Sequence, residues 1–256
     1  NSFIYSLYLI LFISALSKLK SKGAKSFVID LRGNEGGYLD AATSMINEFF
    51  PKGDLIVYAE GRSFPRTDSY ATGTGTCKEN DVVVLIDELS ASSSEIFAGA
   101  MQDNDRGLVL GRRSFGKGLV QSQRVFKDGS AMRLTVARYY TASGRSIQRE
   151  YEKGKNAEYE MEAVYRYMQG NYMDSDSINS VEMTPFKTIG GRTVYGGSGI
   201  MPDIFIPRDS VAMNSYYQSV MSKGYVQEYA AYYTDINRSK LEDFESWEEL
   251  NDYLKK

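Results

Sequence analysis

The segment DVVVLIDELSASSSEIFAGAMQ, residues 81–102, decides the predicted fold. Its first part, residues 81–87, is an apolar run typical of a fully buried strand. The serines that follow lead into a helix predicted over residues 92–102, whose apolar face consists of Ile96, Phe97, Ala100 and Met101. A buried strand that passes directly into a helix favours an α/β domain.

The neighbouring segments continue this alternation of strands and helices. Residues 27–31 predict a buried strand that ends in the glycine-rich loop RGNEGG, and residues 40–50 predict a helix. Further strands are predicted at residues 55–59 and 108–110, and a hairpin at residues 119–126 and 131–140. The apolar run at residues 3–16 is too short to span a bilayer comfortably, and we expect it to be a buried strand or helix.

Two later segments differ in character. Residues 150–185 are polar, charged and rich in Tyr and Met, and are expected to form a partly helical insertion. Residues 192–207 return to strand and turn signals, and residues 209–256 have a helical pattern.

The composition excludes several kinds of site. A net charge of -3 and a pI near 5.3 give no sign of nucleic-acid binding. The single cysteine, Cys77, has no partner for an internal disulfide. The chain has no histidine, which argues against a catalytic zinc site and predicts neither metal nor cofactor. Any serine nucleophile must therefore use a base other than imidazole.

The serine cluster permits two interpretations. Ser92 and Glu95 have the spacing of a helix capping box, which is a structural feature of many helices. A serine at a helix start also exposes its hydroxyl where backbone N–H groups attract an oxyanion. The two interpretations are compatible, although a hydroxyl that attacks a substrate cannot be fully committed to capping.

The segment FGKGLVQ, residues 115–121, contains the candidate base. A lysine in a glycine-rich loop is usually solvated, and it serves as a base only if its pKa falls from about 10.4 towards roughly 7–8. Gly116 and Gly118 would let the backbone pack closely and exclude water. Residues 117, 119 and 121 of a strand point to one side, so Gln121 would hold the amine of Lys117 by a hydrogen bond.

The loop at residues 33–37 also permits two interpretations. Glycines after a strand most often form only a turn. They would also offer unobstructed N–H groups, so that Gly36 or Gly37 could form an oxyanion hole with the N–H of Ser93. A phosphate-binding loop at residues 111–117 is disfavoured, because Gly118 stands where such loops have Ser or Thr and a strand pattern follows.

Taken together, these motifs resemble the S41 family of C-terminal processing (tail-specific) serine peptidases. The resemblance covers roughly residues 15–207, and its blocks are DLRGNEGG at 30–37, SASSSEI at 90–96, FGKGLVQ at 115–121 and GSGIMPD at 197–203. The serine-to-lysine separation agrees with that of the family. Two positions depart from the family pattern: Glu35 replaces the usual proline, and Ser93 replaces the usual alanine.

The resemblance implies a fold and a site. The fold is an α/β, ClpP/crotonase-like superhelical core over residues 1–208, with the insertion at about 150–185 and a helical C-terminal extension over 209–256. The implied nucleophile is Ser92, with Ser93 or Ser94 as alternatives. The base is Lys117, oriented by Gln121, and the oxyanion hole combines Gly36, Gly37 and Ser93.

The implied activity is endopeptidase cleavage near protein C-termini through an acyl-enzyme, so protein or peptide segments are the expected partners. The location implied is periplasmic or otherwise extracytoplasmic, with any membrane anchor outside this chain. Family members usually carry an upstream PDZ domain, which was not found here, so we expect either a fragment or a different mode of substrate recognition. The alternative is a catalytically silent peptide- or ligand-binding module on the same fold; a crotonase-type acyl-CoA enzyme lacks support in the motifs.

Overall fold

The computed structural model describes residues 2–151, 154–174, 184–209, 215–244 and 246–255. The chain divides into two compact units, Asn1–Arg208 and Asp209–Lys256. The first unit contains all of the strands and all of the predicted site residues. The assignment of these units as a peptidase core and an extension stays a prediction.

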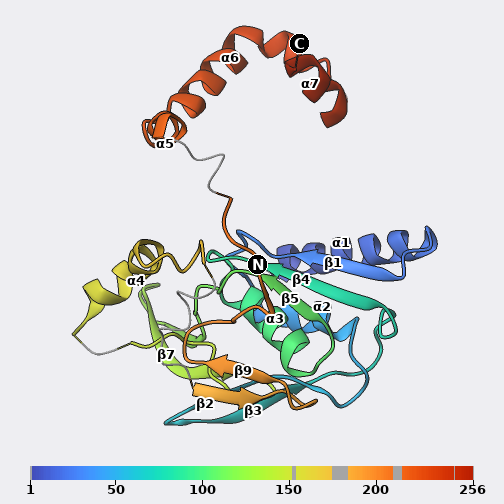
Figure 1. The fold of residues 1–256 in the computed structure, drawn as a ribbon, viewed down its shortest axis with the longest axis vertical. Helices are drawn as coiled ribbons and strands as arrows, with labels where there is room; N and C mark the ends of the chain where they lie inside the picture. The colour runs from blue at the N-terminus through green and yellow to red at the C-terminus, as the bar shows by residue number, and fades with distance from the viewer. Residues whose placement is uncertain (1, 152–153, 175–183, 210–214, 245, 256) are drawn as a thin grey trace. The chain divides into compact units, whose positions relative to one another are not determined.

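A four-stranded parallel sheet forms one layer of the first unit (Figure 1). Its order is β1 (Ser26–Asp30), β4 (Asp81–Ile86), β5 (Leu108–Gly111) and β10 (Ile204–Phe205). The prediction that β1 and β4 are fully buried is wrong, because burial alternates along both strands. In the edge strand β1, Phe27 is buried whereas Val28 is 65% exposed, since successive side chains point to opposite faces of a sheet.

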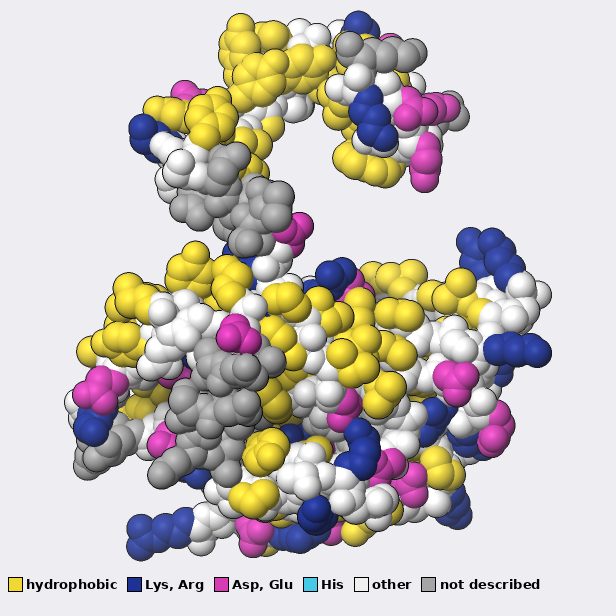
Figure 2. All heavy atoms as spheres, in the orientation of Figure 1, with side chains coloured by type: hydrophobic (Ala, Val, Ile, Leu, Met, Phe, Trp, Pro, Cys, Tyr) yellow, Lys and Arg dark blue, Asp and Glu magenta, His cyan; other side chains and the backbone are white. Residues whose placement is uncertain are grey.

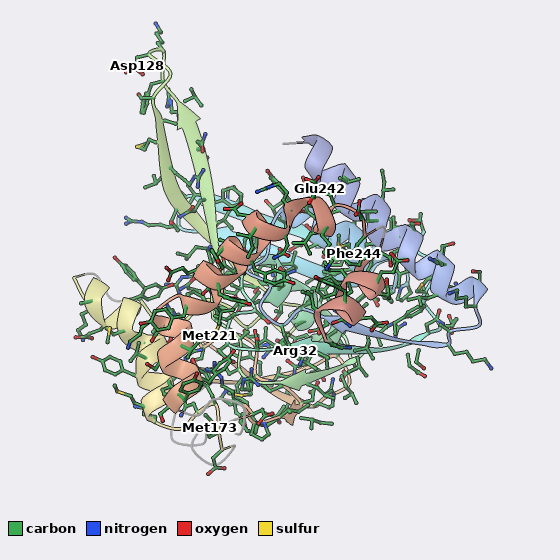
Figure 3. All side chains as sticks on the ribbon, turned by 90° about the horizontal axis from the view of Figure 1, so that it is seen from above. Arg32, Asp128, Met173, Met221, Glu242 and Phe244 are labelled. Carbon is green, nitrogen blue, oxygen red and sulfur yellow. The ribbon has the colours of Figure 1, made fainter. Side chains whose placement is uncertain are left out.

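The second layer is an antiparallel sheet in the order β3 (Phe64–Tyr70), β2 (Leu55–Gly61), β7 (Ala131–Tyr140) and β6 (Leu119–Val125). The predicted hairpin is β6 and β7, and it projects from the rest of the unit with Asp128 at its tip (Figure 3). The sequence analysis missed β3, whose polar, proline-containing sequence shows no apolar alternation and which lies at the sheet edge.

Helix α3 (Ser93–Asp103) lies between the two sheets (Figure 1) and contacts β2, β4 and β5. All of its residues are buried, and small residues such as Gly99 and Ala98 allow neighbouring segments to pack closely against the helix. Helix α2 (Leu39–Asn47) packs against α3. This central position of α3 fixes the place of its first residues, which are the predicted nucleophile region.

The N-terminal apolar run forms helix α1 (Ser2–Ser21), one of the two predicted possibilities. The expectation that it is buried is wrong. Leu16 is buried against the core, but Tyr8 and Ile10 are each 61% exposed, because apolar residues surround the helix and only one side packs on α2. Within the described residues, no helix has the length and apolarity that a membrane crossing requires.

The remaining segments are partly as predicted. The insertion contains helix α4 (Asn156–Met168), and its residues 152–153 and 175–183 lie outside the described residues. Strands β8 (Thr184–Lys187) and β9 (Thr193–Gly196) form a separate hairpin, of which β8 was not predicted. The C-terminal unit is helical, as expected, with α5 (Ser215–Ser222), α6 (Tyr225–Leu241) and α7 (Trp247–Leu254). Hydrophobic side chains gather on its surface (Figure 2), notably Tyr225, Tyr229, Tyr232 and Ile236 of α6.

Candidate active site

Ser92 stands at the N-cap of α3 with an unusual backbone conformation. Its φ of 56° and ψ of -118° lie in a region of backbone conformation that residues other than glycine rarely adopt. Such strain costs on the order of 1–3 kcal/mol and is most often found at functional sites. Ser92 and Glu95 form the predicted capping box: the Ser92 side chain faces the N–H of Glu95, and the Glu95 carboxylate accepts from the N–H of Ser92. The same serine therefore serves both as the cap of α3 and as the candidate nucleophile.

Glu95 is fully buried and connects the two predicted catalytic segments. Its Oε2 accepts hydrogen bonds from the backbone N–H of Ser92 at 2.9 Å and of Lys117 at 2.8 Å. Its Oε1 accepts from the backbone N–H of Gly116 at 2.7 Å and from the hydroxyl of Ser114. A single carboxylate therefore holds the start of α3 beside the loop that carries Lys117.

Burial raises the pKa of Glu95, and the four donors around its carboxyl oppose that rise. Sequence reasoning identified Glu95 only as the partner of Ser92 in a capping box. The contacts with Gly116 and Lys117 bridge 21 and 22 residues of sequence, respectively. No local pattern could have revealed them, because a glutamate at this position is already accounted for by the capping box.

The loop before β6 is pinned by several further contacts. The N–H of Phe115 donates to the carbonyl of Ser90 at 3.0 Å, and the N–H of Arg149 donates to the carbonyl of Gly116 at 3.0 Å. Gly116 has a φ of +89°, and a Cβ there would lie 2.9 Å from the Cβ of Arg149. The expected close packing of the backbone around Lys117 is therefore present.

The side chains of Lys117 and Gln121 differ from expectation. Both residues are exposed, so the water-excluding environment expected around the amine is absent from this structure. Among the described contacts, neither the Lys117 amine nor the Gln121 side chain makes a hydrogen bond. Because β6 begins at Leu119, Lys117 precedes the strand that was expected to place it on one face with Gln121. The structure brings the backbones of Ser92 and Lys117 to one carboxylate, and no hydrogen bond joins their side chains among the described contacts.

The glycine loop lies directly against the serine cluster. A Cβ on Gly36 would come within 2.9 Å of the Ser92 Cβ and 2.8 Å of the Ser93 nitrogen. Two of the three predicted oxyanion donors are occupied: the N–H of Gly36 donates to Asn34 Oδ1 at 2.9 Å, and the N–H of Gly37 donates to Ser93 Oγ at 2.6 Å. The N–H of Ser93 has no partner within the described part of the chain.

Ser94, the other alternative nucleophile, is buried at the first turn of α3 and its hydroxyl donates to Asn34 Oδ1 at 2.9 Å. The Ser93 hydroxyl is likewise engaged, with Gly37. Ser93 and Ser94 are both buried, whereas Ser92 is partly exposed. Over the same described residues, no group of His, Cys, Asp and Glu side chains has an arrangement that could hold a metal ion.

This mixed α/β fold is similar to those of solved serine proteases. A photosystem II D1 C-terminal processing protease superposes with a TM-score of 0.52 at 34% sequence identity, over 58% of this chain and 37% of that one. A lipoprotein from Streptococcus agalactiae superposes with a TM-score of 0.51 over 86% of this chain and 62% of that one. At 14% identity, the second similarity concerns the fold alone.

The chain belongs to peptidase family S41, whose model matches residues 11–159. It is 40% identical over 135 residues to the "Probable CtpA-like serine protease" of Staphylococcus haemolyticus (strain JCSC1435). That alignment covers 52% of this chain and 27% of the relative, so the chain spans about a quarter of the length of that curated protein.

Proposed function

We propose that this chain provides the catalytic core of a Ser–Lys endopeptidase that cleaves peptide bonds near protein C-termini. The observation that carries the proposal is the shared Oε2 oxygen of Glu95, which holds the backbone of a strained Ser92 beside the backbone of Lys117. Family membership supports the same assignment. Cleavage near C-termini draws further support from the similarity to the D1 C-terminal processing protease.

The proposed reaction is acyl transfer in two steps. In the first, the neutral amine of Lys117 accepts the proton of the Ser92 hydroxyl while Oγ bonds to the substrate carbonyl carbon. The resulting oxyanion accepts a hydrogen bond from the N–H of Ser93. The N–H of Gly36 or Gly37 becomes the second donor once its present hydrogen bond is broken. The protonated Lys117 then gives its proton to the leaving amine as the peptide bond breaks.

In the second step, Lys117 takes a proton from water, and the hydroxide oxygen attacks the acyl carbon. The ester bond to Ser92 breaks, the carboxylic acid product leaves, and the proton returns to Oγ. Because Lys117 is exposed in this structure, the proposal requires the substrate itself to cover the amine and exclude water. In this proposal Gln121 accepts or donates a hydrogen bond at the amine once the substrate orders both side chains.

The wider assignment follows from the same resemblance. We assign the first unit to a ClpP/crotonase-like superhelical core, and we place the activity outside the cytoplasm. Protein substrates are implied by membership of a peptidase family. Cell fractionation with an antibody against this chain tests the location, and recovery from the cytoplasm alone would contradict it.

The direct test compares Ser92→Ala and Lys117→Ala with the unmodified chain on an unstructured fluorogenic peptide. We expect each to lower turnover by a factor on the order of 10³ or more, with an unchanged circular dichroism spectrum and melting temperature. Ser122→Ala and Lys127→Ala change exposed residues of the β6–β7 hairpin and serve as matched controls. Activity retained by either Ser92→Ala or Lys117→Ala would refute the assignment.

A second candidate is a peptide-binding module without catalysis. The observation in its favour is that the Gly36 and Gly37 N–H groups are occupied and that no hydrogen bond joins the Lys117 amine to Ser92 among the described contacts. A fluorophosphonate probe separates the two functions, because it labels only an activated serine. Labelling that disappears in Ser92→Ala and in Lys117→Ala supports the peptidase, and the absence of labelling together with tight peptide binding supports the module.

A further inference from the structure

Three arginines that contact or adjoin the Lys117 loop share one carboxylate. Arg113, Arg149 and Arg166 are only 4%, 6% and 4% exposed. Arg113 Nη2 lies 3.2 Å from Glu162 Oε1, Arg149 Nη1 lies 2.6 Å from Glu162 Oε2, and Arg166 Nε also pairs with Glu162. The cluster therefore carries two more positive charges than negative charges.

Several donors of these arginines have no acceptor. Within the described residues, Arg113 Nε and Nη1, Arg149 Nε and Arg166 Nη2 are buried and make no hydrogen bond. A buried charged donor without a partner is costly, because it has lost its water without replacement. Burial and the nearby charge of Arg166 also lower the pKa of Arg113 to about 10.

The space for an anion is present. The three arginines line a cavity of about 1010 Å³ between helix α4 and the β8–β9 hairpin, with Gln169 and Ser198 as further polar lining. The charged side chains of Glu150, Lys155 and Glu158 also line it. The guanidinium of Arg149 is fixed between two rings, 4.3 Å from the centroid of Phe115 and 3.9 Å from that of Tyr159. The arginines are thus held in place before any ligand arrives.

We propose that Arg113, Arg149 and Arg166 form a binding site for an oxyanion, either a carboxylate or a phosphate group. Guanidinium groups suit these ligands, because their planar arrays of N–H donors match two oxygens of one anion. The ligand would bind at the guanidinium groups that line the cavity and neutralise their excess positive charge. The ligand is either a free anion or a carboxylate group of a peptide.

The site also touches the loop of the candidate base. Arg166 Nη1 donates to the carbonyl of Ser114 at 2.8 Å, and the backbone of Arg149 holds Gly116. An anion bound to these arginines would strengthen their hold on the loop that carries Lys117. This coupling to catalysis rests on the proposed function, whereas anion binding itself does not.

Thermal unfolding of the whole chain tests the proposal. In the Ser92→Ala background, which prevents cleavage, sodium phosphate is compared with sodium chloride at equal ionic strength. A second comparison uses a short peptide with a free C-terminal carboxylate and the same peptide as its C-terminal amide. A ligand that binds only the folded chain raises the melting temperature with its concentration, by roughly 3–6 °C for each tenfold increase in free ligand above the dissociation constant at this chain size.

A rise with phosphate supports a site for free anions, and a rise with the carboxylate peptide but not with its amide supports a peptide-borne ligand. In either case Arg113→Gln should abolish the rise, and Arg62→Gln, which changes an exposed turn arginine, should leave it intact. If Arg113→Gln does not fold, Arg149→Gln replaces it. The proposal is overturned if neither ligand raises the melting temperature, or if the rise persists in the folded Arg113→Gln or Arg149→Gln variant.

Discussion

The hydroxyl of Ser93 accepts a hydrogen bond from the backbone N–H of Gly37 at 2.6 Å. Both residues belong to the predicted oxyanion hole, and this contact occupies the N–H of Gly37, a donor that the proposed catalysis would use. Ser93 is also the position at which the sequence departs from the alanine usual in the resembled family. An alanine has no oxygen to offer, and the N–H of Gly37 would then be available to substrate.

Ser93→Ala should therefore raise turnover. The hydrogen bond that must be released is worth about 0.5–1.5 kcal/mol, which corresponds to roughly a 2- to 10-fold increase in kcat. The measurement is steady-state cleavage of a fluorogenic peptide. Ser94→Ala is the matched control, because its hydroxyl bonds to Asn34 and not to Gly37. A drop in kcat for Ser93→Ala would show that its hydroxyl assists the reaction.

Gly36→Ala should abolish activity. The glycine has a φ of +89°, and a Cβ would lie 2.5 Å from the carbonyl oxygen of Ala91, so the loop must move away from Ser92. We expect a loss of about 10²-fold or more in kcat, the usual effect of losing an oxyanion donor. Gly33→Ala is the control, since Gly33 has a φ of +67° but nothing within 4 Å of an added Cβ. Equal losses in the two variants would attribute the effect to backbone strain alone.

Glu95→Gln should impair both stability and activity. The amide nitrogen cannot accept hydrogen bonds, so it leaves two of the four donors around residue 95 unsatisfied, at roughly 1–3 kcal/mol each. If the amide nitrogen replaces Oε2, the backbones of Ser92 and Lys117 lose their common anchor. Urea unfolding measures the stability, and kcat measured well below the unfolding transition isolates the catalytic effect. A variant with full stability and full kcat would remove Glu95 from the site.

The raised pKa of Glu95 gives stability a defined pH dependence. The folded chain binds this proton more tightly than the unfolded chain, whose glutamate has an ordinary pKa of 4.5. The contribution is therefore fully present below pH 4.5 and is lost as the pH rises through the higher folded pKa. Relative to Glu95→Gln, the unfolding free energy of the unmodified chain should fall across this window and then level off. A relative free energy that rises instead would mean that the four donors lower the folded pKa.

Turnover should increase with pH if Lys117 is the base. Only the neutral amine can accept the proton of Ser92, so kcat/KM should climb with pH. The pH profile of peptide cleavage tests this, with melting temperatures recorded at each pH to exclude unfolding. A rate that is flat from about pH 6 to 10 would argue against a lysine base.

The sequence alone determined the elements and the chemistry available to them. The apolar run of β4 followed by the serines and the apolar face of α3 predicted a strand–turn–helix, and the absence of histidine pointed from Ser92 to Lys117. Local periodicity carries this information because buried strands and helices must present apolar side chains at fixed intervals. It failed for β3, whose edge position demands no such pattern.

Only the tertiary structure decided how these residues meet. Glu95 looked like the end of a capping box, and folding placed its carboxylate between Ser92 and the Lys117 loop. The same holds for the engaged Gly37 donor, the exposed Lys117 side chain and the arginines around Glu162, which come from three separate segments. Contacts between distant segments depend on which faces the core brings together, and no local pattern in a single sequence encodes them.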